Sequence, residues 1–165
     1  MVDVVVCGVA GRMGQRLALL SRESEDLNLV GATEHQGHAL IGKDIGTAIG
    51  QANLGIEIVD SLKRILQPGQ VVINFTVPKA TLEAAQLCAE KGIPMVVGTT
   101  GWSPIELEQF KATVASIPCV FASNFSTAMN VLFKLAEDAA RILGDDYDVE
   151  IVEALVHTAV NAASP

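Results

Sequence analysis

The sequence predicts an α/β fold, a doubly wound parallel sheet followed by the start of a second, α+β domain. Short runs rich in valine and isoleucine, such as 2–7 and 71–75, alternate with helical patterns. Strands that are apolar along their whole length are typical of a parallel sheet with helices on both faces. The last predicted strand, 148–153, instead alternates in polarity, as half-buried strands do. We therefore expect one domain over 1–126 and part of another over 127–165.

We predict the individual elements from apolar runs and from the glycine and proline residues that interrupt them. We predict strands at 2–7, 27–33, 56–59, 71–75, 94–97 and 118–121, and helices at 12–25, 61–66, 78–91 and 127–143. A further helix is predicted to begin at Ser103, because Ser103 and Glu106 have the spacing of a capping box. The glycine-rich segment 34–55 is predicted to be a long loop.

Composition limits the partners of the chain. Of the 165 residues 50% are hydrophobic and 4% aromatic, and the formal net charge is −8. A negative protein repels phosphate backbones and anionic lipid head groups, so neither nucleic acid nor a membrane surface is an expected partner. Charged residues make up 18%, below the roughly 25% of an average soluble domain. Part of the apolar surplus is therefore expected to meet another chain.

Cysteine usage and the first residues favour the cytoplasm. Cys7, Cys88 and Cys119 form no CxxC pair, which predicts reduced thiols and no metal site. The N-terminus lacks the basic start and cleavage site of a signal peptide. No stretch approaches the roughly 18 apolar residues of a membrane span. We expect a soluble, cytoplasmic protein.

A glycine turn follows the first strand and opens the first helix. Gly8, Gly11 and Gly14 have the spacing GxxGxxG, and Glu34 ends the second strand. Glycines at such a turn let backbone N–H groups approach a pyrophosphate, and a carboxylate about 20 residues further on accepts from the ribose hydroxyls. Glu34 repels a 2′-phosphate, and a mostly neutral His35 compensates less than an arginine does, which favours NAD(H) over NADP(H). The alternatives are a purely structural turn and a solvated carboxylate.

Three further loops are predicted at the carboxyl ends of strands, where ligands of doubly wound sheets lie. They are the segments 74–78 (NFTVP), 98–101 (GTTG) and 122–126 (ASNFS). Their glycines and small hydroxyl residues present backbone groups that a ribose and a nicotinamide carboxamide need. Each loop alone is equally explained as a turn.

Five ordered motifs carry a resemblance to a known family. The segments 8–14 (GVAGRMG), 74–78, 98–101, 124–126 with Asn130, and 148–153 (DVEIVE) resemble 4-hydroxy-tetrahydrodipicolinate reductase, also called dihydrodipicolinate reductase. The resemblance implies a Rossmann-like cofactor domain, a substrate domain that builds a homotetramer, and hydride transfer from NADH or NADPH to a cyclic intermediate of the diaminopimelate route to lysine. It places the pyrophosphate on Gly8, Val9, Ala10, Gly11, Arg12 and Met13, and the ribose on Glu34. It places the nicotinamide end between Gly98, Thr99 and Thr100 and the loop of Ala122, Ser123, Asn124 and Phe125.

The sequence departs from this family after residue 153. The family motif there contains two histidines, one of them the proton donor, and a lysine that assists it. This chain has Leu155 and Val156 at the histidine positions and Ala159 at the lysine position, and none of these side chains can transfer a proton. His157 either projects into the same cleft two positions later or is an exposed or interface histidine. The resemblance also implies that the chain stops where the family continues, so we expect a truncated member.

These observations leave two classes of function open. The first is an NAD(P)H-dependent reductase of this type, impaired in this chain, with NAD(H) preferred, NADP(H) possible, and a small dicarboxylate as substrate. The second is a non-catalytic dinucleotide-binding homologue or a self-assembling fragment. No catalytic residue and no metal ligand is assigned. A homo-oligomer is expected, since the edge of the strand at 148–156 lacks a partner.

Overall fold

A computed structural model describes residues 1–152, which divide into two compact units, Met1–Phe125 and a second unit that begins at Ser126. Each unit is described by itself. No helix within the described range is long and apolar enough to cross a membrane.

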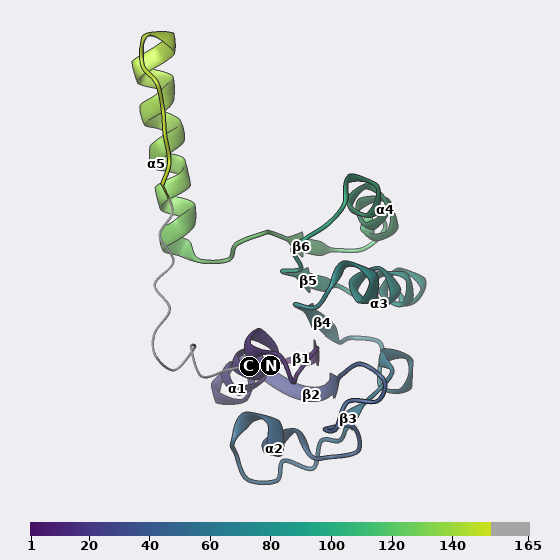
Figure 1. The fold of residues 1–165 in the computed structure, drawn as a ribbon. Helices are drawn as coiled ribbons and strands as arrows, with labels where there is room; N and C mark the ends of the chain where they lie inside the picture. Colours follow the sequence, from purple (N-terminus) through teal and green to yellow (C-terminus); the bar gives the residue numbers. More distant parts are fainter. Residues whose placement is uncertain (153–165) are drawn as a thin grey trace. The chain divides into compact units, whose positions relative to one another are not determined.

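A parallel sheet forms the centre of the first unit (Figure 1). Its strands lie in the order β3-β2-β1-β4-β5-β6. They are β1 (Val2–Cys7), β2 (Leu27–Thr33), β3 (Ile58–Val59), β4 (Val71–Asn74), β5 (Met95–Val97) and β6 (Cys119–Phe121), and every neighbouring pair is parallel. The chain runs outward from β1 to β3 and then crosses to β4 on the other side of β1. This order places a topological switch point between β1 and β4, where doubly wound sheets bind ligands, and it confirms the predicted fold class.

Helices cover the sheet from both faces and create two separate cores. The helices α1 (Arg12–Glu23) and α2 (Ile45–Ile49) pack with Val4 and Val6 of β1. On the other face α3 (Pro78–Lys91), α4 (Pro104–Val114) and the 3₁₀ turn η1 (Leu62–Arg64) pack with Val5 and Val72. Figure 1 shows α3 and α4 together on one side of the strands. Because successive residues of a strand point to opposite faces, β1 supplies both cores.

Both predicted ends of α3 and the predicted start of α4 are confirmed. Pro78 is the first residue of α3, and Gly92 closes that helix with a left-handed φ of 67°. Ser103 accepts from the Glu106 N–H while the Glu106 side chain accepts from the Ser103 N–H, a complete capping box for α4. The proline at the first helical position and the capping box determine where the two helices start. They thereby also determine where the preceding loops, at the carboxyl ends of β4 and β5, end.

The segment 34–55 differs from the predicted long loop, because it contains α2. The Asp44 carboxylate caps this helix and accepts three backbone N–H groups, from Gly46 at 2.8 Å, Leu54 at 2.9 Å and Ile56 at 3.0 Å. Five residues are too few to show the helical period of apolar residues. The glycines of the segment therefore predict a loop instead. The strand predicted at 56–59 shortens to Ile58–Val59, and the helix predicted at 61–66 is the three-residue η1.

The second unit contains α5 (Thr127–Leu143) with the bounds that the sequence predicts, followed by the 3₁₀ turn η2 (Gly144–Asp146). Ser126 caps α5 by accepting from the Met129 N–H at 3.4 Å. The strand predicted at 148–153 is wrong over the described part, since residues 148–152 form no regular element. A strand is stable only beside a partner, and none of the described strands pairs with this segment.

Candidate dinucleotide site

The glycine turn joins β1 to α1 in a conformation that requires glycine. Gly8 has a φ of 74°, and a Cβ atom there would lie 2.6 Å from Thr76 Cγ2. A Cβ atom on Gly14 would collide with the Gly8 carbonyl oxygen. Gly11 is the N-cap of α1 and supplies no side-chain cap, so within residues 1–152 the first N–H groups of this helix have no side-chain acceptor and can bind an anion.

Glu34 accepts hydrogen bonds from two backbone N–H groups, one of which belongs to this turn. Its Oε2 accepts from the Ala10 N–H at 2.8 Å, and its Oε1 accepts from the His35 N–H at 2.9 Å. Each carboxylate oxygen retains further acceptor capacity, because an ionised carboxylate accepts about four hydrogen bonds. Both oxygens are thereby oriented in advance to receive a pair of neighbouring hydroxyl groups.

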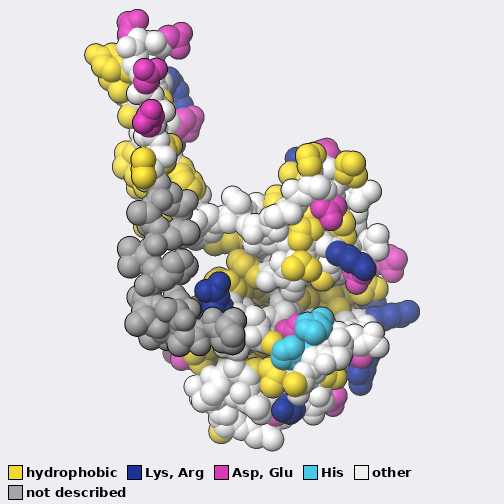
Figure 2. Space-filling model, in the orientation of Figure 1, with side chains coloured by type: hydrophobic (Ala, Val, Ile, Leu, Met, Phe, Trp, Pro, Cys, Tyr) yellow, Lys and Arg dark blue, Asp and Glu magenta, His cyan; other side chains and the backbone are white. Residues whose placement is uncertain are grey.

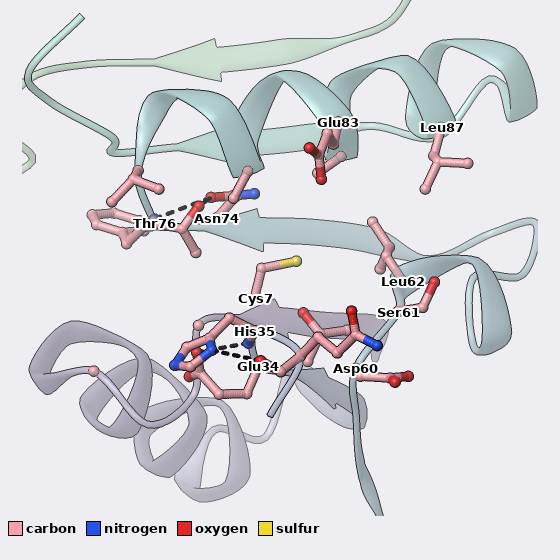
Figure 3. A pocket seen from close by; sticks show the side chains of 18 residues that line it. Cys7, Glu34, His35, Asp60, Ser61, Leu62, Asn74, Thr76, Glu83 and Leu87 are labelled. Carbon is pink, nitrogen blue, oxygen red and sulfur yellow. Dashed lines mark hydrogen bonds between the residues drawn. The ribbon is translucent and has the colours of Figure 1, made fainter. Parts of the chain in front are cut away.

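A cavity of about 640 Å³ opens in front of the turn. It is lined by Cys7, Gly8, Gly11, Thr33, Glu34, His35, Gln36, Asp60, Ser61, Leu62, Asn74, Phe75, Thr76, Val77, Ala80, Glu83, Ala84 and Leu87. Figure 3 shows Glu34 and His35 on one wall and Glu83 and Leu87, from α3, on the opposite wall. Three carboxylates line the cavity, whereas no lysine or arginine of the described residues does. Its size and position suit the adenosine half of a dinucleotide.

A hydrogen-bond network joins the loops that follow β4 and β5. Asn74 Oδ1 accepts from the Thr76 N–H at 3.1 Å and from the Thr81 hydroxyl at 3.1 Å. The Thr81 and Thr99 hydroxyl groups lie 2.7 Å apart. Asn74, Thr81 and Thr99 are buried, so this network is shielded from water and fixes both loops.

Phe75 brings the three predicted loops together. Its ring packs on Gly98, where a Cβ atom would collide with it. The rings of Phe75 and Phe125 lie 5.5 Å apart between centroids. The loops at 98–100 and 122–125 therefore meet beside the loop at 74–78, at one edge of the sheet.

The predicted site residues divide into three groups. Gly8, Gly11 and Glu34 line the cavity. Val9, Ala10, Arg12 and Met13 belong to the same turn without lining the cavity, and the Val9 side chain is fully buried in the core. The residues at 98–100 and 122–125 lie outside the cavity, and of these Gly98 and Phe125 lie next to the Phe75 ring.

Sequence reasoning missed the far wall of the cavity. Ala80, Glu83, Ala84 and Leu87 line it from one face of α3, and their spacing of three and four residues could have identified that face. Asp60 and Ser61 follow the two-residue strand β3, and no motif marks them.

Cys7 contributes a thiol to the cavity wall that is not a nucleophile. Burial raises the pKa of Cys7 to about 11, although a hydrogen bond with the Thr33 side chain lowers it in part. Since the thiolate is the reactive form, this residue is inert near neutral pH. Among the residues that the structure describes, no cluster of three metal-ligating side chains occurs. Four residues of the altered family motif lie outside the described residues, namely Leu155, Val156, His157 and Ala159.

The fold and the glycine turn define a dinucleotide-binding domain of the Rossmann class. The family model described as dihydrodipicolinate reductase, N-terminus, matches residues 2–125. The chain belongs to this family, which confirms the resemblance.

The relatives are consistent with this assignment. The chain is 48% identical over 153 residues to a 4-hydroxy-tetrahydrodipicolinate reductase of Anaeromyxobacter sp. (strain Fw109-5), covering 93% of this chain and 56% of the relative. It is 46% identical over 154 residues to the reductase of the same name of Desulfotalea psychrophila, covering 93% and 57%. The chain thus spans a little over half the length of these curated relatives.

Solved structures support the fold. The dipicolinate-bound dihydrodipicolinate reductase of Paenisporosarcina sp. TG-14 matches with a TM-score of 0.65 and 24% identity, over 84% of this chain and 53% of that one.

Proposed function

We propose that this chain binds NAD(H) and is the coenzyme-binding part of a 4-hydroxy-tetrahydrodipicolinate reductase, an enzyme of the diaminopimelate route to lysine. The observation that carries the proposal is the double anchoring of Glu34 by the Ala10 and His35 N–H groups. This arrangement presents two fixed acceptors to the adenosine ribose, while the glycine turn beside it receives the pyrophosphate.

The proposed preference for NAD(H) over NADP(H) rests on charge. A 2′-phosphate would lie beside the Glu34 carboxylate, and Asp60 and Glu83 add two further carboxylates to the same cavity. Like charges repel one another. NADP(H) binding is therefore proposed to be possible but weaker than NAD(H) binding. The nicotinamide end is proposed to lie beside Phe75, between the loops at 98–100 and 122–125.

A second candidate is a non-catalytic dinucleotide-binding homologue. The sequence observation that favours it is the set of aliphatic residues, Leu155, Val156 and Ala159, where the family has its proton donor and assisting lysine. Loss of a general acid costs roughly 10²- to 10⁴-fold in rate. For either candidate we propose a cytoplasmic protein that forms homo-oligomers, with a small dicarboxylate as the substrate of the reductase.

The proposal is tested by titrating the purified chain with NADH and recording fluorescence. Glu34→Ala is expected to weaken NADH binding by at least about 10- to 100-fold, since the loss of even one hydrogen bond to a charged acceptor costs about 1.5–3 kcal/mol. Glu34→Gln keeps one acceptor oxygen and should be intermediate. Glu108→Ala is the matched control, because Glu108 is exposed on α4, outside the cavity, and pairs with Lys111 at 3.0 Å. Equal affinity of Glu34→Ala and the wild-type chain would contradict the site.

Turnover tests the second candidate. NADH oxidation is followed after addition of freshly generated 4-hydroxy-tetrahydrodipicolinate. Rapid oxidation excludes the non-catalytic homologue, whereas binding of NADH without oxidation agrees both with that homologue and with a coenzyme-binding part by itself. If NADH does not bind at all, both candidates are wrong.

A further inference from the structure

We infer that Thr81 is a positioning residue for the nicotinamide end of the coenzyme, because its buried hydroxyl group anchors the loop at 98–101, here called the β5 loop, to the start of α3. This inference rests on the proposed dinucleotide binding and deepens it. Thr81 does not line the cavity, so it acts on the coenzyme only through the β5 loop.

Thr81 lies in the first turn of α3 with its hydroxyl group in the interior of the first unit. It is fully buried, whereas Ala80 and Glu83 of the same helix line the cavity. Burying a hydroxyl group is unfavourable unless it is hydrogen-bonded. Four oxygen atoms lie within hydrogen-bond distance of Thr81 Oγ1: the Val77 carbonyl oxygen at 3.1 Å, Asn74 Oδ1 at 3.1 Å, Thr76 Oγ1 at 3.2 Å and Thr99 Oγ1 at 2.7 Å.

The direction of these hydrogen bonds makes Thr81 the acceptor for Thr99. The Asn74 side chain is hydrogen-bonded to Thr76 (Figure 3). Its Oδ1 accepts from the Thr76 N–H at 3.1 Å, so this atom is the amide oxygen and can only accept. The Val77 carbonyl oxygen likewise only accepts, so the single hydrogen of the Thr81 hydroxyl is directed to these two atoms. Thr99 therefore donates its own hydroxyl hydrogen to Thr81 across the 2.7 Å contact.

The β5 loop joins β5 to α4 and contains no regular secondary structure. Two further hydrogen bonds contact its backbone: the Gly98 N–H donates to the carbonyl oxygen of the last residue of β4 at 3.0 Å, and the Trp102 indole N–H donates to the Thr99 carbonyl oxygen at 2.8 Å. Thr99 itself is 1% exposed, so its hydroxyl group depends on Thr81 and not on water. Loss of this acceptor would leave a buried donor unpaired and would favour a displaced loop.

The β5 loop is also where the nicotinamide end is proposed to lie. Thr99 is buried and the next residue, Thr100, is exposed. A displacement of Thr99 therefore also moves Thr100 and the backbone groups that are offered to the nicotinamide ribose and ring. The adenosine end does not depend on this hydroxyl group, because two backbone N–H groups orient Glu34. Thr81 is thus expected to affect one half of the coenzyme.

The anchor consists of neutral groups. The buried polar residues that the structure describes, Asn74, Thr81 and Thr99 among them, are uncharged. Figure 2 shows lysine, arginine, aspartate and glutamate side chains at the surface of the first unit. The β5 loop is therefore anchored here by hydrogen bonds and not by ion pairs. Valine differs from threonine by a methyl group in place of the hydroxyl group, so Thr81→Val removes the anchor without changing the charge.

The experiment compares the affinity of the full chain for NADH with its affinity for ADP, which has the adenosine and the pyrophosphate but neither the nicotinamide ribose nor the ring. The measured quantity is the Kd for NADH divided by the Kd for ADP, each from calorimetric titration. Thr81→Val is expected to raise this ratio about tenfold, the effect of one lost hydrogen bond, at an unchanged Kd for ADP. Thr81→Ser keeps the hydroxyl group and should keep the wild-type ratio, even where the lost methyl group lowers the Tm.

Thr113→Val is the matched control. The Thr113 hydroxyl donates to the Gln109 carbonyl oxygen at 2.8 Å, one turn back in α4, as Thr81 does to Val77 in α3. This control removes the same kind of helical hydrogen bond outside the cavity and should leave the ratio unchanged. Thr99→Val removes the donor of the 2.7 Å hydrogen bond and should raise the ratio as Thr81→Val does. The double variant should raise it no further, because both substitutions break one bond.

The outcomes that would overturn the inference differ in what else they affect. If NADH and ADP bind and a folded Thr81→Val chain keeps the wild-type ratio, or weakens both ligands equally, Thr81 is merely structural while the dinucleotide site stands. A ratio in Thr81→Ser as high as in Thr81→Val would assign the effect to the methyl group and reject the anchor. If Thr81→Val does not fold, Thr99→Val decides by the same criterion. If the wild-type chain binds neither NADH nor ADP, the inference and the dinucleotide site fail together.

Discussion

Cys7 ends β1 with its thiol facing the cavity (Figure 3), yet its chemistry is suppressed by burial. Desolvation raises the pKa of Cys7 to about 11 and that of Cys88 to about 12. We predict that iodoacetamide at about pH 8 leaves both residues unmodified in the folded chain, because a buried neutral thiol does not react. Peptide mass spectrometry after labelling measures this, with the denatured chain as the control. Rapid native modification of Cys7 would contradict the burial of its thiol.

The same pKa values predict that the fold weakens in alkali. The ordinary pKa of a cysteine is 9.0, and both buried thiols have raised values in the folded state. A raised folded pKa contributes stability below the unfolded value, and this stability is lost as the pH rises above it. The free energy of unfolding should therefore decline from about pH 9 toward about pH 11, measured by urea titration. Cys7→Ser with Cys88→Ala should reduce this decline.

At the scale of elements, Asp44 holds together the connection between β2 and β3. Its carboxylate accepts from three backbone N–H groups, and the hydrogen bond from Leu54 is the first cause that lowers the pKa of Asp44. We predict that Asp44→Ala lowers the Tm more than Asp60→Ala, because the Asp60 carboxylate forms a surface ion pair with Arg64. Equal Tm values for the two variants would mean that the connection does not need Asp44.

The contribution of Asp44 to the free energy of unfolding changes with pH in the opposite direction to that of the buried thiols. A lowered folded pKa contributes stability above the unfolded value, and this stability is lost as the pH falls. The wild-type chain should therefore lose more stability on acidification than Asp44→Asn, whose side chain keeps one acceptor oxygen and does not ionise. Thermal unfolding monitored at neutral and at acidic pH measures this difference.

The elements also show what could be predicted from the sequence and what could not. The bounds of α3 and α5 follow from local signals, namely Pro78, Gly92 and an amphipathic period that ends at Gly144. The helix α2 was missed, because it depends on hydrogen bonds from the Leu54 and Ile56 N–H groups to Asp44. These residues are ten and twelve positions away from Asp44, so no local pattern indicates the bonds. The strand expected at 148–153 failed for a similar reason, since alternation of polarity does not supply a neighbouring strand.

The candidate site likewise contains residues that could be predicted from the sequence and residues that could not. Glu34 and the glycines were predictable, because their spacing along the chain reflects one β-α-β unit. Asp60 and Glu83 reach the cavity from two other elements, and only the order of the strands brings these elements together. Their carboxylates add to the negative charge of the cavity, whereas the sequence predicted the preference for NAD(H) from Glu34 and His35 without them.

At the scale of the whole molecule, the two units differ in how they bury apolar side chains. The unit Met1–Phe125 contains both hydrophobic cores. None of the residues of α5 is buried. Val131, Leu135 and Ile142 share one face of this helix and are 53%, 61% and 83% exposed. Lys134, Glu137, Asp138 and Arg141 form ion pairs along the side of the helix next to this row.

An exposed apolar face on an amphipathic helix is typical of a surface that packs against another element or another chain. We therefore predict that the chain self-associates through α5 at micromolar concentration, which sedimentation velocity measures. Leu135→Glu combined with Ile142→Glu should shift the chain toward the monomer, because charges on this face oppose its burial. NADH affinity and the Tm of the first unit should remain unchanged, since both cores and the cavity lie within residues 1–125. Lys111→Ala on α4 is the control for a surface substitution outside this face. A wild-type chain that sediments as a monomer at every concentration would exclude α5 as an interface between copies.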